Sequence, residues 1–158
     1  MAMRDVILVA VVLFTFGSAF FIINFVGNTM NTELIGTPAI ASDADAVAAF
    51  NAIGTTVNRL DYLVLALFIG LILGIIVTAW FVGGYPIFMF IYFIVIALGV
   101  LISAVLANVW ETFTSEVVFG TTLSNFPITN NIILHLPVYV SVAGFIAIIV
   151  MFAKPRED

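Results

Sequence analysis

The chain has 158 residues, of which 64% are hydrophobic and 8% charged, with a formal net charge of -5 and no cysteine. A mean hydropathy of +1.30 lies outside the range of soluble domains and predicts a membrane protein. The lack of cysteine excludes disulfides and thiol chemistry, and the lack of any Lys or Arg cluster argues against nucleic acid as a partner.

Four uninterrupted apolar runs of about twenty residues each divide the chain, and none contains a charged residue. Each matches the ~20 residues with which an α-helix crosses a ~30 Å hydrocarbon core, and none alternates as a barrel strand does. We therefore predict a single integral membrane domain, an all-α bundle of four transmembrane helices. The predicted spans are 6–26, 62–82, 87–107 and 132–152, with outer loops 27–61 and 108–131.

The first run needs a check against a secretory signal, because residues 17–19 read Gly-Ser-Ala and resemble a cleavage site. The apolar run continues past this site through Ile23, so we expect it to be retained as a span.

The basic residues predict the orientation of the bundle. Arg4, Lys154 and Arg156 flank the termini, whereas the two outer loops together hold only Arg59. Four spans place both termini on one side, and the positive-inside rule makes that side cytoplasmic.

The first outer loop is predicted to be irregular from Asn28 to Ala41 and helical afterwards. Ser42, with the Asp45 carboxylate three residues on, is typical of an N-cap, and apolar residues at helical spacing follow, so an amphipathic helix is expected to start near Asp43. No proline separates Asp43 from Val82, so this helix is expected to extend the second span, with Gly54 as its bend. Its apolar residues are candidate partner contacts: Val47, Phe50 and Val57.

The short turn at 83–86 predicts that spans two and three are neighbours in an antiparallel hairpin. Small residues at four-residue spacing are typical of faces where helix backbones approach closely in a membrane. We expect these faces to pack within the chain, and the alternative is a contact between subunits. The residues are Gly70 and Gly74 in span two, Gly99, Ser103 and Ala107 in span three, and Gly144 in span four.

The second outer loop is expected to form a short β-hairpin or an irregular flap around Gly120. Val117, Val118 and Phe119 are costly to expose to water, so a partner protein or the bilayer surface is expected to cover them. Aromatic residues mark the expected interfaces, with Trp80, Phe81 and Tyr85 at the inner level and Tyr62, Trp110 and Phe113 at the outer.

His135 is the only histidine and the one candidate for a metal or proton-relay role. A single imidazole with scattered carboxylates lacks the ligand spacing of a metal site, so we expect a neutral ring bonded to a carbonyl or a hydroxyl at the interface, and no metal or cofactor. Pro137 should kink the fourth span near its outer end. Four asparagines are expected to tie helix ends together, and the alternative is a selectivity ring in an oligomeric pore: Asn24, Asn108, Asn130 and Asn131.

The spans lack the charged side chains of proton relays, voltage sensors and charged substrate sites, so catalysis is not expected. The favoured hypothesis is a structural or accessory subunit of a larger membrane assembly, either a multi-subunit complex or the membrane of a lipid-containing virus particle. Its expected partners are the lipid bilayer and other membrane-associated subunits, including copies of itself. The alternative hypothesis is an oligomeric pore, channel or holin-like protein.

Overall fold

The computed structural model describes residues 2–82 and 86–153, and every element in those ranges is helical. Four segments are long and apolar enough to cross a membrane, at Asp5–Ile35, Ala44–Phe81, Phe90–Thr114 and Leu136–Ala153, which confirms the prediction of an all-helical chain with four such lengths. The elements are α1 (Ala2–Ile35), α2 (Pro38–Ala41), α3 (Ala44–Asn58), α4 (Leu60–Val82), α5 (Pro86–Thr114), η1 (Val117–Phe119), α6 (Gly120–Asn125), α7 (Pro127–Leu134) and α8 (Leu136–Ala153).

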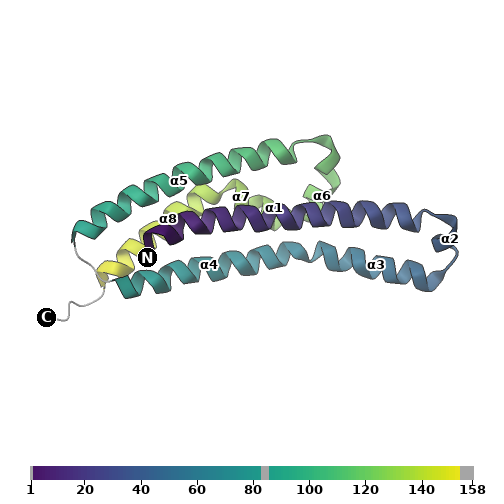
Figure 1. The fold of residues 1–158 in the computed structure, drawn as a ribbon, viewed down its shortest axis with the longest axis horizontal. Coiled ribbons are helices and arrows are strands. Elements are labelled where there is room, and N and C mark those ends of the chain that lie inside the picture. The colour runs from purple at the N-terminus through teal and green to yellow at the C-terminus, as the bar shows by residue number, and fades with distance from the viewer. Residues whose placement is uncertain (1, 83–85, 154–158) are drawn as a thin grey trace.

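The long helices form an elongated bundle in which α1 and α8 each pack along both α4 and α5 (Figure 1). Among the described residues α4 and α5 share no extensive contact, so the expectation that spans two and three are neighbours is wrong. Four Cα steps from Val82 to Pro86 reach roughly 14 Å, the diagonal of a bundle with neighbouring axes ~8–10 Å apart. A short connection therefore permits a diagonal crossing. The turn residues 83–85 lie outside the described residues.

The bundle interior is filled by apolar side chains. In the half nearer the start of α1, which we call the inner half, they come from all four long helices. The small residues of α5 point into this interior, because Ser103 and Ala107 are buried and a β-carbon on Gly99 would lie 3.3 Å from Val6 Cγ1. A β-carbon on Gly144 of α8 would lie 2.8 Å from the side chain of Ile96 on α5. Gly99 and Gly144 therefore lie where helices approach each other closely.

At the opposite, outer end, α1 continues to Ile35, and α2 and α3 return along it as a helical projection (Figure 1). We call residues 27–58 the outer hairpin. The expectation that residues 28–41 are irregular is wrong, since most of them belong to α1 and α2. α3 begins at Ala44, close to the predicted start, but its N-cap is Asp43 and not Ser42. The Asp43 carboxylate accepts hydrogen bonds from the backbone N–H groups of Asp45 and Ala46 at 3.0 and 3.2 Å.

The rod predicted from Asp43 to Val82 is interrupted at Arg59, and not at Gly54. Gly54 is buried against α1, where a β-carbon would lie 3.1 Å from Asn31 Nδ2, so this part of α3 follows α1. The break falls where the chain changes neighbours, because α3 packs on α1 whereas α4 also packs on α7 and α8.

The second outer segment is helical and contains no strand in the described residues, so the β-hairpin alternative is wrong. α5 continues to Thr114 and is followed by η1, α6 and α7. The fourth span is interrupted at His135, between α7 and α8. This confirms the kink expected from Pro137, since a proline in a helix lacks an N–H group and its ring clashes with the carbonyl of residue i−4.

Candidate functional site

Asp61 forms a buried connection between α4 and the N-terminus of α7. Its side chain is 3% exposed. One carboxylate oxygen accepts hydrogen bonds from the Thr129 N–H group and hydroxyl at 2.7 and 2.6 Å, and the other accepts from the Ile128 N–H group at 3.0 Å. A carboxylate is stabilised there because the first N–H groups of a helix lack partners and the helix dipole is positive at this end.

Asp61 is the last residue of the predicted outer loop 27–61, and the sequence interpretation gave it no role. Two signals for it were present: an ionisable residue beside an apolar run is costly unless it has partners, and Pro127 is typical of a helix start. Asp61 is 67 residues from Ile128 and 68 from Thr129 in the sequence, and no local pattern reveals a contact over that separation.

Asparagine side chains hold the base of the outer hairpin. Asn24 is fully buried and donates to Asn58 Oδ1 at 2.8 Å, and Asn28 donates to both Asn24 Oδ1 and Asn58 Oδ1 at 3.0 Å. Asn31 lies one turn further out and its buried Oδ1 has no partner among the described residues. These amides join α1 to α3, which is the kind of role expected for Asn24.

The other predicted asparagines have separate positions. Asn130 accepts a hydrogen bond from Trp110 Nε1 at 2.9 Å, and Asn131 accepts one from the Tyr139 hydroxyl at 3.1 Å. Asn108 is exposed. The three amides other than Asn108 therefore occupy different contacts within the chain.

An aromatic cluster packs beneath the outer segment. Trp110 is fully buried, so its expected place at the lipid interface is wrong, and Phe21 contacts it edge-on with ring centroids 5.1 Å apart. Phe119, expected to contact a partner, is half-buried and packs against Phe113 and Phe25, with ring centroids 4.6 and 4.9 Å away. Of the aromatic residues expected at the interfaces, Tyr62, Trp80 and Phe81 are exposed, and Tyr85 lies outside the described residues.

The remaining predicted partner contacts divide into two groups. Val47, Phe50 and Val57 of α3 are half-buried, and Val57 packs on Gly27 of α1, so part of this face is used within the chain. Val117 and Val118 are 94% and 67% exposed at the outer end. Their side chains remain available to a partner or to the bilayer surface.

The small face of α4 points away from the chain. Gly70 and Gly74 are exposed, and a β-carbon on either would meet nothing within 4 Å. The expectation that this face meets span three is wrong, because α4 packs on α1 and α8 with its other sides.

His135 lies at the break between α7 and α8, where it is exposed and its Nδ1 is 2.9 Å from the Asn131 carbonyl oxygen. No group of three or more His, Asp or Glu side chains suited to a metal occurs in the described part of the chain. The ring therefore has a carbonyl partner, which is one of the two kinds of partner expected.

We expect His135→Gln to change the free energy of unfolding by less than about 1 kcal/mol, because a glutamine amide can donate to the same carbonyl. Denaturant titration in detergent micelles, followed by circular dichroism, measures this change. A loss above about 2 kcal/mol, or a metal that co-purifies with the wild type and not with the variant, would contradict the structural role.

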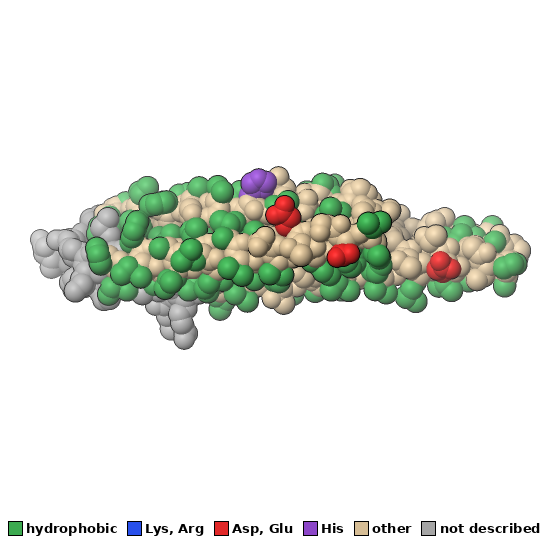
Figure 2. Space-filling model, turned by 90° about the horizontal axis from the view of Figure 1, so that it is seen from above, with side chains coloured by type: hydrophobic (Ala, Val, Ile, Leu, Met, Phe, Trp, Pro, Cys, Tyr) green, Lys and Arg blue, Asp and Glu red, His purple; other side chains and the backbone are tan. Residues whose placement is uncertain are grey.

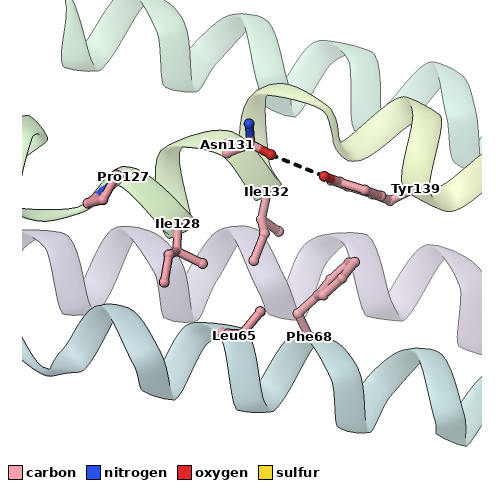
Figure 3. Close-up of a pocket in the computed structure, with 7 residues that line it drawn as sticks. All are labelled: Leu65, Phe68, Pro127, Ile128, Asn131, Ile132 and Tyr139. Atoms are coloured by element: carbon pink, nitrogen blue, oxygen red, sulfur yellow. Dashed lines mark hydrogen bonds between the residues drawn. The ribbon is translucent and has the colours of Figure 1, made fainter.

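Two adjoining hollows follow the seam between α4 and α7, and Pro127 and Ile128 line both. The apolar hollow has a volume of about 330 Å³ and is shown in Figure 3, where the Asn131–Tyr139 hydrogen bond lies along one rim. Its remaining lining residues are Leu65, Phe68 and Ile132. The polar hollow, of about 410 Å³, lies at the break between α3 and α4 and is lined also by Thr55, Asn58, Arg59, Asp61, Tyr62, Ser124 and Asn125.

The face of the molecule in Figure 2 is covered mostly by hydrophobic side chains, with acidic groups scattered singly along it. Comparison with protein-family models, with curated proteins and with solved structures finds no match to this chain. The fold therefore defines a class only: a helical protein with four segments long and apolar enough to span a membrane.

Proposed function

We propose that the protein is a non-catalytic structural or accessory subunit of a larger membrane-embedded assembly. The outer hairpin carries this proposal. α1 has 34 residues and is ~50 Å long, whereas a bilayer core is ~30 Å thick, so α1 and α3 project beyond the lipid together. With the termini on the cytoplasmic side, as the basic residues predict, this projection faces the opposite side.

The polar chemistry of the chain supports a structural role. The Asp61 carboxylate and the amides of Asn24, Asn28 and Asn58 are engaged in hydrogen bonds between helices. Most serine and threonine hydroxyls bond to carbonyls of their own helices, as Ser103 does to Gly99 at 2.6 Å. Much of the surface that remains for interaction is apolar, which favours contact with proteins and lipid.

Apolar side chains on the outer hairpin are the expected contact with a partner. Met30 of α1 and Ile53 of α3 are 56% and 51% exposed, in the part of the chain that the predicted spans leave outside the bilayer. Val117 and Val118 extend such surface on the second outer segment. Exposed apolar groups of this kind mark protein contacts when they lie outside lipid.

The test is affinity purification of the tagged full chain from its native membrane in gentle detergent. We expect other proteins to co-purify in fixed stoichiometry, and Met30→Glu with Ile53→Glu to reduce their yield by about tenfold, because a carboxylate in an apolar contact loses hydration. Ala48→Glu is the matched control, since Ala48 is exposed on the same helix about 140° around its axis from Ile53.

A chain that purifies alone, or that loses its partners equally with Ala48→Glu, would contradict this proposal. Robust ion or dye flux through liposomes holding only this chain would favour the pore hypothesis instead. The exposed faces of the spans give that hypothesis no specific support, because they are lined mostly by apolar residues such as Leu73, Leu101 and Ile149.

A further inference from the structure

The two hollows between α4 and α7 lie one after the other along the seam, the polar hollow at the outer end and the apolar hollow further in. A bound lipid has the same order, with its headgroup outside its acyl chains. The polar hollow surrounds Arg59 at the outer end of α4, and the apolar hollow begins one to two turns further in, at Leu65 and Phe68. Leu60 to Phe68 covers roughly 12 Å along the helix, nearly half of a ~30 Å hydrocarbon core. The seam therefore spans most of one leaflet, from its headgroup level inward.

We propose that this seam binds one anionic phospholipid of the outer leaflet, with its phosphate at Arg59 and one acyl chain in the apolar hollow. The inference does not depend on the proposed function. The volumes of about 330 and 410 Å³ fall in the ~300–1,000 Å³ range of ligand pockets. A ligand that is charged at one end and apolar at the other matches both hollows at once.

Arg59 supplies the positive charge at the polar hollow. It is exposed, it lines the polar hollow, and it is the only Lys or Arg side chain whose surroundings the structure describes. A guanidinium presents several donors in a plane and binds phosphate oxygens in pairs. Asn58 adds an amide, whose oxygen already accepts from Asn24 and Asn28, so that its NH₂ group remains to donate.

Asp61 also lines the polar hollow and requires an explanation, because a carboxylate repels phosphate. Its side chain is 3% exposed, and both of its oxygens accept hydrogen bonds from Ile128 and Thr129 of α7. Its charge is thereby held against the N-terminus of a helix, which offsets it. The exposed donors around the hollow then come from Arg59 and Asn58, since the Ser124 hydroxyl donates to the Thr121 carbonyl at 2.6 Å.

The apolar hollow has the shape and lining of a site for an acyl chain. Leu65 and Phe68 form its wall on α4, and Ile128 and Ile132 form the wall on α7 (Figure 3). Tyr139 closes the inner end, where its hydroxyl is engaged by Asn131 and its ring lies edge-on to Phe68 at 5.1 Å. The break at His135 separates α7 from α8 along this wall.

The test is native mass spectrometry of the full chain, purified in mild detergent and titrated with phosphatidylglycerol or phosphatidylcholine. We expect one phosphatidylglycerol to be retained at least fivefold more strongly than phosphatidylcholine. Arg59→Gln should remove a preference of about fivefold, the factor that corresponds to ~1 kcal/mol per basic residue near a lipid surface. Arg59→Lys should keep most of it, because the positive charge remains.

The acyl-chain part is tested separately with Leu65→Trp, which fills the apolar hollow and should reduce retention of both lipids by about tenfold. Leu73→Trp is the matched control, because Leu73 lies on the same helix and is 56% exposed. Circular dichroism shows whether each variant keeps its helices.

Three results would overturn the proposal. The first is equal retention of the two lipids by the wild type, and the second is equal loss with Leu65→Trp and Leu73→Trp. The third is a dimer peak that Leu65→Trp removes and Leu73→Trp does not, because the occupant of the seam would then be a second copy of the chain.

Discussion

Asp61→Ala is expected to lower the free energy of unfolding by roughly 3 kcal/mol or more. The substitution leaves the N–H groups of Ile128 and Thr129 and the Thr129 hydroxyl without their acceptor, and Thr129 is fully buried. A hydrogen bond to a charged group contributes ~1.5–3 kcal/mol, and a buried donor left unpaired costs ~1–3 kcal/mol. Asp61→Asn retains one acceptor oxygen, so we expect about half of the loss.

The measurement is denaturant titration in mixed micelles, with hydrogen exchange as a second readout. Exchange should increase first at the Ile128 and Thr129 amides, because these lose their partner directly. Asp45→Ala is the control: Asp45 is exposed in the first turn of α3 and its removal should cost less than ~1 kcal/mol. Equal losses for Asp61→Ala and Asp45→Ala, or unchanged exchange in α7, would show that the connection contributes little.

Gly144→Ala is expected to destabilise the bundle by about 1–3 kcal/mol, the cost of overpacking a well-filled interior. A β-carbon at this position would lie 2.8 Å from both Ile96 Cδ1 and Cγ1 and 3.0 Å from Cγ2. Because three carbons of one branched side chain are involved, a change of rotamer alone does not relieve the clash. α5 and α8 must separate locally.

Gly70→Ala is the same chemical change, but it is expected to stabilise the protein and not to destabilise it. Nothing lies within 4 Å of the added carbon, so the gain in helix propensity should stabilise the isolated chain by roughly 0.5–1 kcal/mol. Ile96→Ala should partly rescue Gly144→Ala, with a coupling energy of about 1 kcal/mol in a double-mutant cycle. Similar effects of Gly144→Ala and Gly70→Ala, or strictly additive effects of Gly144→Ala and Ile96→Ala, would contradict the packing of α5 on α8.

The two glycine sites show where the sequence interpretation reached its limit. Gly70, Gly74, Gly99 and Gly144 belong to the same pattern of small residues, yet Gly99 and Gly144 face other helices and the pair on α4 faces outward. The spans are apolar on every side, and an amphipathic pattern is what normally identifies the buried face of a helix. Nothing local in the sequence therefore distinguishes an inward from an outward glycine.

Only part of the candidate site could be predicted from the sequence, because its other contacts join residues that are distant in the sequence. Asn24 was expected to connect helix ends, and an amide near the end of an apolar span indicates such a role by its chemistry alone. Its partner Asn58 is 34 residues away, and the α7 partners of Asp61 are 67 and 68 residues away. Arg59 and Ile128 line the same hollow, which exists only because α4 packs against α7.

Sequence alone was sufficient for the four membrane-spanning lengths, the start of α3 after Asp43 and the interruption near Pro137. These features depend on local quantities: hydrophobicity summed over ~20 residues, a side chain that caps its own helix, and a ring that removes one hydrogen bond. Tertiary structure alone decided that α4 and α5 lie diagonally, that Asp61 is buried against α7 and that Gly144 packs on Ile96. Uniformly apolar helices can pack through any face, so these pairings follow from the shapes of side chains distant in sequence.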